Sequence, residues 1–169
     1  INNSIETGNF HDKKEFEDII SYSRKNSSNI HLIGLLSDGG VHSHIDHLKE
    51  IILSLSDVKE KIFIHAFTDG RDVDPKSGIN YIETLETFCK EKGGNLATVI
   101  GRYFSMDRDN RWERIYKAYD LICNGNGKKT KNFINELKDS YSKNITDEFI
   151  EPIIKTDKNG NTVHQLKQN

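Results

Sequence analysis

The sequence predicts an α/β fold, a three-layer α/β/α domain with a mostly parallel sheet. Short stretches rich in β-branched residues alternate with longer segments whose apolar residues recur at helical spacing. This alternation is typical of βαβ units, whose parallel sheets are covered by helices on both faces. The 169 residues are enough for one domain with a buried core. We therefore expect a single domain over 1–169, with a lead-in over about 1–28 and an exit hairpin or connector over about 155–169.

The first half of the chain supplies two predicted helices and two predicted strands. Residues 13–25 and 48–55 place their apolar side chains at helical spacing. The apolar run 30–36 is short enough to be a buried strand, and residues 61–67 are rich in β-branched and aromatic side chains.

The second half continues the pattern. Its predicted elements are a helix over 81–89, a strand over 96–100, a helix over 112–119 and a helix over 132–141. Gly93 and Gly94 follow the first of these helices as a C-terminal stop, and Gly125 follows the second. The run Asp-Lys-Asn-Gly at 157–160 predicts a hairpin turn.

Composition excludes several classes of protein. The formal net charge of −2 argues against a nucleic-acid-binding domain, which usually carries a basic excess. No apolar run approaches the ~20 residues needed to cross a bilayer. Cys89 and Cys123 stand in helix-like stretches and are expected to be reduced, partly buried thiols. We expect a cytoplasmic protein that binds neither nucleic acid nor membrane.

Unusual residues gather in three segments, 37–44, 69–72 and 101–109, each directly after a predicted strand. The loops that follow parallel strands share one edge of the sheet, and ligands bind at that edge. We therefore expect five side chains to converge there as the substrate site: His42, Arg71, Asp72, Arg102 and Arg108.

The residue types at this edge suit a small phosphorylated anion. Guanidinium groups match carboxylate and phosphate oxygens in bidentate fashion, so the three arginines indicate a ligand that carries both groups. Asp72 beside Arg71 is expected to stay ionised and to accept a proton or hydrogen bond from a substrate hydroxyl, which makes it the candidate catalytic residue. His42 can donate to a phosphate or hydroxyl oxygen.

The histidines allow another interpretation. His42, His44 and His47 suit zinc or manganese, so a small metal-dependent hydrolase is one alternative. No carboxylate cluster with metal-like spacing follows them, however, and we expect no metal in this chain. His65 alternates within a strand and is expected to be a packed core residue. No role is assigned to the remaining histidines, His11, His31 and His164.

Arginines and carboxylates alternate over 107–114 in a way typical of a salt-bridged helix start, and we expect that role for Arg111 and Arg114. Arg108 precedes the helix, where ligand binding and a structural role are equally open. The spacing of three aromatic residues predicts that they belong to the core: Trp112, Tyr116 and Tyr119.

The chain shows a binding edge without a chemical nucleophile. Gly39-Gly40 is accompanied by no Walker or GxGxxG pattern, which disfavours nucleotide binding. No Ser, Cys or Thr stands in a recognisable nucleophile elbow. The chain opens on Ile1 rather than Met, and we expect it to be part of a longer polypeptide.

Three runs closely resemble the cofactor-independent (2,3-bisphosphoglycerate-independent) phosphoglycerate mutases. They are LLSDGGVHSH at 35–44, DGRDV at 69–73 and GRYFSMDRDNRWER at 101–114. INNSI at 1–5 and TDEF at 146–149 are similar to the same family, so the resemblance runs in order over nearly the whole chain.

The resemblance implies that this chain is the substrate-binding domain of such a mutase and is inactive alone. A phosphatase-like domain of the same polypeptide would carry the nucleophilic serine and two manganese ions, while this chain would hold no cofactor. Phosphate would pass from 3-phosphoglycerate to that serine and then to the other hydroxyl of the reoriented glycerate. Asp72 would handle the hydroxyl proton, and four residues would hold the carboxylate and phosphate: His42, Arg71, Arg102 and Arg108. A monomer is expected. A stand-alone module that binds phosphorylated sugar acids is the other alternative.

Overall fold

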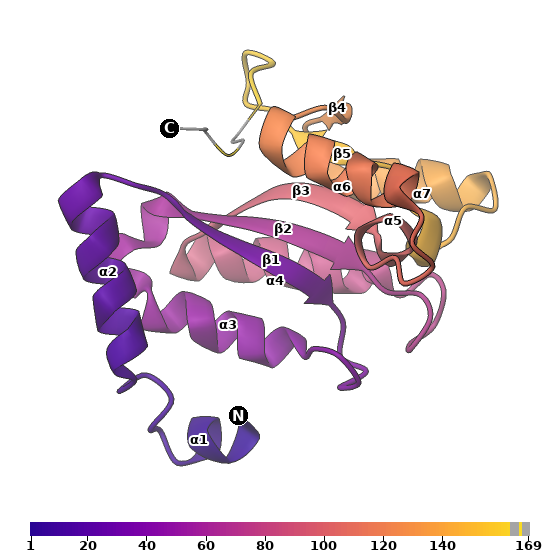
Figure 1. Cartoon of the computed structure of the whole chain (residues 1–169). Helices are drawn as coiled ribbons and strands as arrows, with labels where there is room; N and C mark the ends of the chain where they lie inside the picture. The colour runs from indigo at the N-terminus through magenta and orange to yellow at the C-terminus, as the bar shows by residue number, and fades with distance from the viewer. Residues whose placement is uncertain (163–165, 167–169) are drawn as a thin grey trace.

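The structure is a computed structural model that describes residues 1–162 and residue 166. Within these residues a five-stranded sheet runs in the order β1-β2-β3-β5-β4 (Figure 1). The first three strands of that order are parallel, while β5 is antiparallel to β3 and parallel to β4. The predicted α/β class with a mostly parallel sheet is therefore confirmed. The strands are β1 (Ile30–Leu36), β2 (Ile62–Thr68), β3 (Asn95–Gly101), β4 (Lys128–Thr130) and β5 (Ile153–Lys155).

Every helix expected from the sequence is present, and shorter ones join them. The long helices are α2 (Lys14–Asn26), α3 (Ile45–Ser54), α4 (Gly78–Lys92), α6 (Trp112–Asn124) and α7 (Phe133–Ser142). The short elements, which the sequence did not predict, are α1 (Asn2–Glu6), η1 (Ser56–Lys61), α5 (Arg102–Ser105) and η2 (Asp147–Phe149).

Local sequence explains where the helices begin and end. Gly125 stops α6 in the left-handed conformation, with φ 71°, as its position after the apolar stripe predicted. The side chain of Asn132 caps α7 by accepting the N–H of Asn135. The imidazole of His44 does the same for α3 by accepting the N–H of Asp46.

The core lies on both faces of the sheet. One apolar cluster joins β2 and β3 to α3, α4 and α7, and a smaller one joins β3 and β5 to α5 and α6. Val99 belongs to the first cluster and Ile100 to the second, because successive side chains of a strand point to opposite faces. Figure 1 shows α3 and α4 beneath the sheet and α6 above β3 and β5. This is the expected three-layer arrangement.

A bulge interrupts the pairing of β2 with β3. Ile64 is opposite Leu96, but the next residue, His65, is opposite Thr98, so β3 carries Ala97 as an extra residue. The extra residue lets Leu96 and Val99 face the same core, although they are an odd number of positions apart.

The prediction that the α6 aromatic residues belong to the core is wrong. Trp112 is 75% exposed, Tyr116 60% and Tyr119 50%. The helix buries its opposite stripe instead, because smaller side chains fit against the sheet there: Ala118, Leu121 and Ile122.

The histidines of β1 and β2 form a partly buried polar chain. His65 is fully buried, as predicted, and its ring nitrogens bond to Thr98 Oγ1 at 2.9 Å and to His31 Nδ1 at 2.8 Å. His31 therefore has a structural role that the sequence did not suggest. His11 contacts Ser54 and Glu50, while His164 lies outside the described residues.

Three further expectations concern single features. Cys89 and Cys123 are both free thiols, with Cys89 buried. The predicted turn at 157–160 is present, with Gly160 at φ 85° and Thr156 bridged to Thr162. Among the described residues, no helix combines the length and apolar character that a membrane span requires.

Candidate active site

The register of the parallel strands brings three loops to one edge. Leu36 of β1 is opposite Thr68 of β2, which is opposite Gly101 of β3. The residues that follow therefore leave the sheet side by side: Ser37, Asp69 and Arg102. The convergence predicted from the sequence rests on this alignment.

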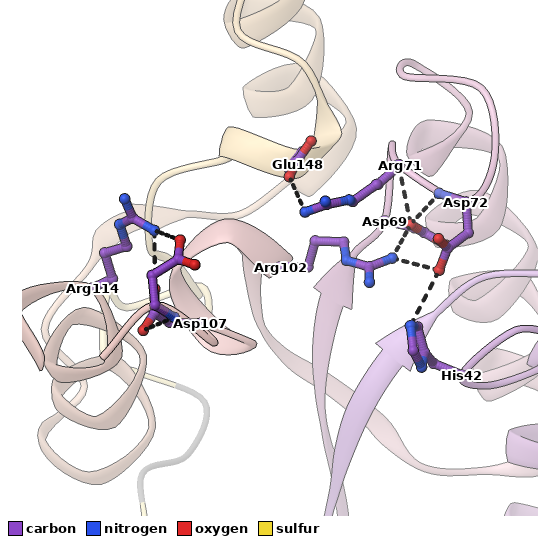
Figure 2. A network of polar contacts seen from close by, with 9 residues as sticks. His42, Asp69, Arg71, Asp72, Arg102, Asp107, Arg114 and Glu148 are labelled. Atoms are coloured by element: carbon purple, nitrogen blue, oxygen red, sulfur yellow. Dashed lines mark hydrogen bonds and ion pairs between the residues drawn. The ribbon is translucent and has the colours of Figure 1, made fainter. Parts of the chain in front are cut away.

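Arg102, the first residue of α5, lies at the centre of the edge (Figure 2). Its Nη1 donates to Asp69 Oδ1 at 2.7 Å and to Asp72 Oδ2 at 2.6 Å. Burial alone would lower the pKa of Arg102, but the bonds to Asp72 and Asp69 raise it above its ordinary value. The site thus contains a fixed positive group.

Asp69 is the buried residue of this group, with its side chain 1% exposed. Besides Arg102, its Oδ1 accepts the backbone N–H groups of Arg71 at 3.1 Å and Asp72 at 3.0 Å, which closes an Asx-type turn. Gly70 sits inside the turn at φ 65°, where an added Cβ would lie 2.8 Å from the Asp147 Cβ. Burial alone would raise the pKa of Asp69, but hydrogen bonds from Asp72, Ser37, Arg102 and Arg71 lower it below its usual range.

Asp72 and His42 face each other beside Arg102 (Figure 2). The distance from His42 Nε2 to Asp72 Oδ2 is 3.8 Å, too long for a hydrogen bond but close enough for electrostatic attraction when the imidazole is protonated. The His42 side chain is half-exposed, while that of Asp72 is 18% exposed. Asp72 therefore has access to a ligand and still contacts Arg102.

Arg71 points toward η2 rather than toward Asp69. Its Nη1 lies 3.5 Å from Glu148 Oε1, and its side chain is half-exposed. Next to Glu148, the ring of Phe149 packs against that of Tyr103, with centroids 5.0 Å apart.

The three remaining arginines of the run 101–114 differ in role. Arg114 donates to Asp107 at 2.9 Å and Asp109 at 3.1 Å, and its Cζ lies 4.0 Å from the centre of the Tyr103 ring. Its predicted structural role is confirmed. The salt-bridged role predicted for Arg111 is wrong, because this side chain has no ion pair within the described part of the chain and only its backbone N–H bonds to Asp107. Arg108 is exposed at the same place.

These side chains enclose a pocket of about 230 Å³. Four of the five predicted site residues line it: His42, Arg71, Arg102 and Arg108. Asp72 adjoins it through its contacts with Arg102 and His42. The rest of the lining is Tyr103, Met106, Asp107, Asp109, Arg114, Glu148 and Phe149.

Sequence reasoning missed Asp69 and the η2 residues Glu148 and Phe149. Asp69 stands within the second loop, and its place directly after a strand was a usable signal. Glu148 gave no such signal, because η2 follows a helix and precedes a strand too short to recognise. It reaches the site because Gly101 N–H bonds to Ile150 O at 2.7 Å, which holds η2 against the end of β3.

The rings of His44 and His47 lie near each other, with centroids 5.6 Å apart, but the three histidines turn to different partners. His42 faces Asp72, whereas His44 caps α3 and His47 contacts Asn2. Over residues 1–162 and 166, no group of three or more His, Cys, Asp or Glu side chains is placed to hold a metal ion.

Comparison with known proteins identifies the family. The family model described as "BPG-independent PGAM N-terminus (iPGM_N)" matches residues 1–169. The chain belongs to this family.

Relatives carrying the name 2,3-bisphosphoglycerate-independent phosphoglycerate mutase are similar over much of the chain. The Flavobacterium psychrophilum protein is 48% identical over 99% of this chain and 34% of its own length. The Listeria monocytogenes protein is 45% identical over 100% of this chain and 33% of its own length. The chain thus spans about a third of the length of these mutase relatives.

A solved structure shares the fold of this chain. The Leishmania mexicana phosphoglycerate mutase, crystallised at low cobalt concentration, aligns with a TM-score of 0.88 and 26% sequence identity. The alignment covers 98% of this chain and 32% of that one.

Proposed function

We propose that this chain is the substrate-binding domain of a phosphoglycerate mutase that interconverts 3-phosphoglycerate and 2-phosphoglycerate. The observation that carries the proposal is the arrangement of Arg71, Arg102, Arg108 and His42 around one small pocket. Phosphoglycerate carries a carboxylate and a phosphate, and both are anions that guanidinium groups bind in bidentate fashion.

Asp72 is the catalytic residue of the proposal. Its carboxylate is partly exposed beside the pocket, so it can accept the proton of a glycerate hydroxyl. As that hydroxyl oxygen forms its bond to phosphorus, the bond between phosphorus and the serine oxygen breaks. The arginines and His42 hold the glycerate so that one hydroxyl or the other faces the phosphoryl group.

The phosphoserine is proposed to form in a phosphatase-like domain of the same polypeptide, which would also bind two manganese ions. The fact that supports this division is length, since the relatives are about three times as long as the chain. We further propose that the complete enzyme is a cytoplasmic monomer of glycolysis and that this domain alone does not turn over substrate.

The test is a titration of the chain with 3-phosphoglycerate, followed by amide shifts in NMR, beside a mutase assay with added manganese. We expect shifts near residues 42, 71–72 and 102–108, no turnover, and weak affinity because part of the ligand's contacts would come from the other domain. Arg102→Ala should abolish the shifts, whereas the surface variant Arg24→Ala should not. Turnover by the chain alone, or shifts that survive Arg102→Ala, would contradict the proposal.

A further inference from the structure

Asp69 and Asp72 share one nitrogen of Arg102, but the structure surrounds the two carboxylates differently. The Asp69 side chain is 1% exposed and the Asp72 side chain 18%. Asp69 is held by Arg102 and by two backbone N–H groups. Asp72 has its side-chain contacts on the pocket side, with Arg102 and His42. One carboxylate is therefore fixed, and the other is able to move.

We propose that Asp69 is the positioning residue of the site, which holds Arg102 in place while Asp72 changes partner. This inference rests on the proposed function, in which Asp72 accepts a proton from a glycerate hydroxyl. To do so, Asp72 must turn an oxygen toward that hydroxyl and, once protonated, it no longer attracts Arg102 as an anion. Asp69 stays bound to Nη1 throughout and keeps the buried guanidinium paired.

The geometry at Arg102 shows what this fixation achieves. Both carboxylates bind Nη1, and no residue of the described chain is hydrogen-bonded to Nη2. Rotation of the guanidinium about its Cζ–Nε bond would exchange the two nitrogens and break the pair with Asp69. By opposing that rotation, Asp69 holds the guanidinium in one fixed orientation, with its second terminal nitrogen left for a ligand oxygen.

The same carboxylate also fixes the second loop. Its Oδ1 binds the N–H groups of Arg71 and Asp72, and so sets the backbone from which both side chains leave. One buried group thus positions three of the predicted site residues: Arg71, Asp72 and Arg102. Asp69 itself does not line the pocket, so it acts through these residues rather than on the substrate.

The experiment follows the arginine side chains by NMR in the whole chain labelled with 15N-arginine. Slow guanidinium rotation gives separate Nη1 and Nη2 signals, and fast rotation merges them. The variants are Asp69→Asn, which keeps an oxygen for the backbone N–H groups but removes the charge, and Asp72→Asn. Asp57→Asn is the matched control, because Asp57 pairs with Arg24 at 2.8 Å on the surface.

We expect separate Arg102 signals in the wild type, in Asp72→Asn and in the control, and merged signals in Asp69→Asn. Affinity for 3-phosphoglycerate should fall at least about tenfold in Asp69→Asn, as expected for a lost charged hydrogen bond. The proposal would be overturned by merged Arg102 signals in the wild type, by merged signals in Asp72→Asn, or by separate signals in a folded Asp69→Asn. If Asp69→Asn does not fold, the Arg102 signals of Asp72→Asn still test the proposal. Because rotation is measured without ligand, a wild type that binds no 3-phosphoglycerate counts against the proposed function only.

Discussion

The backbone N–H of Gly78 donates to the buried carboxylate of Asp147 at 2.7 Å, which joins the start of α4 to η2. The same carboxylate accepts the hydroxyl of Tyr141, and Thr68 Oγ1 donates to the Asp147 backbone oxygen at 2.7 Å. Burial raises the pKa of Asp147 to about 6, although the bonds from Tyr141 and Gly78 act to lower it. Asp147 therefore anchors the segment that presents Glu148 to the pocket.

The buried carboxylate of Asp147 predicts a pH effect on stability. Because the folded pKa of about 6 lies above the ordinary 3.8, the folded state binds a proton that the unfolded state lacks between these values. The contribution of Asp147 to stability is thus present at low pH and is lost as the pH rises through about 6. As the pH rises across this range, the free energy of unfolding should fall less in Asp147→Asn than in the wild type. Urea unfolding at a series of pH values measures this difference. Asp57→Asn serves as the control. If the free energy of unfolding of Asp147→Asn depended on pH as strongly as that of the wild type, the prediction would be wrong.

Gly101→Ala is expected to destabilise the chain at the site. An added Cβ would lie 2.3 Å from the Glu148 backbone oxygen and 2.6 Å from the Ile150 nitrogen, so η2 would have to move. Such overpacking costs about 3 kcal/mol, measurable as a loss in the free energy of urea unfolding. Gly34→Ala is the matched control, because nothing lies within 4 Å of its added Cβ. Equal stability of the two variants would show that η2 is not held tightly against β3.

Glu148→Gln should strengthen anion binding. Glu148 lines the pocket and lies 3.5 Å from Arg71, where it neutralises the guanidinium and repels an anionic ligand. Removing its charge should raise the affinity for 3-phosphoglycerate by about two- to fivefold at low salt, the size expected for one partly screened charge. Calorimetric or NMR titration at two salt concentrations checks this, and the gain should shrink as salt increases. Weaker binding would mean that Glu148 is needed to orient Arg71.

The two cysteines should react with thiol reagents at different rates. Burial raises the pKa of the Cys89 thiol to about 11, so it holds little of the reactive thiolate at neutral pH. Cys123 is less buried. Titration with a chromogenic disulfide should show one fast and one slow thiol, and Cys123→Ser should remove the fast phase. Loss of the slow phase in that variant would contradict the assignment.

Trp112, the only tryptophan, provides a simple optical test. At 75% exposure its fluorescence should be quenched by acrylamide nearly as strongly in the folded chain as in urea. Protection in the folded chain would indicate that another surface covers this end of α6.

The sequence predicted the elements with a clear period and missed those without one. Seven-residue strands and helices of ten or more residues show apolar repeats, whereas β4 and β5 have three residues each, too few to display a pattern. The α6 aromatics were misplaced because helical spacing shows that they share a face but not which face is buried. That choice was made by the smaller residues opposite, which fit against β3 and β5.

The site was predictable where a loop follows a parallel strand. His42, Arg71, Arg102 and Arg108 line one pocket because the ends of β1, β2 and β3 are level. Glu148 was not predictable, because η2 is held at the pocket by bonds to residues distant in sequence, among them Thr68 and Gly101. The roles of these residues in substrate binding remain predictions.

The bulge at Ala97 has a consequence for how this domain tolerates change. If Ala97 were deleted, β3 would become a regular strand, with Leu96 still opposite Ile64 and Thr98 still opposite His65. Val99 and Ile100 would keep their faces of the sheet, and Arg102 would keep its place at the end of the strand. The length of β3 can therefore shrink by one residue at the bulge without moving the guanidinium out of the pocket.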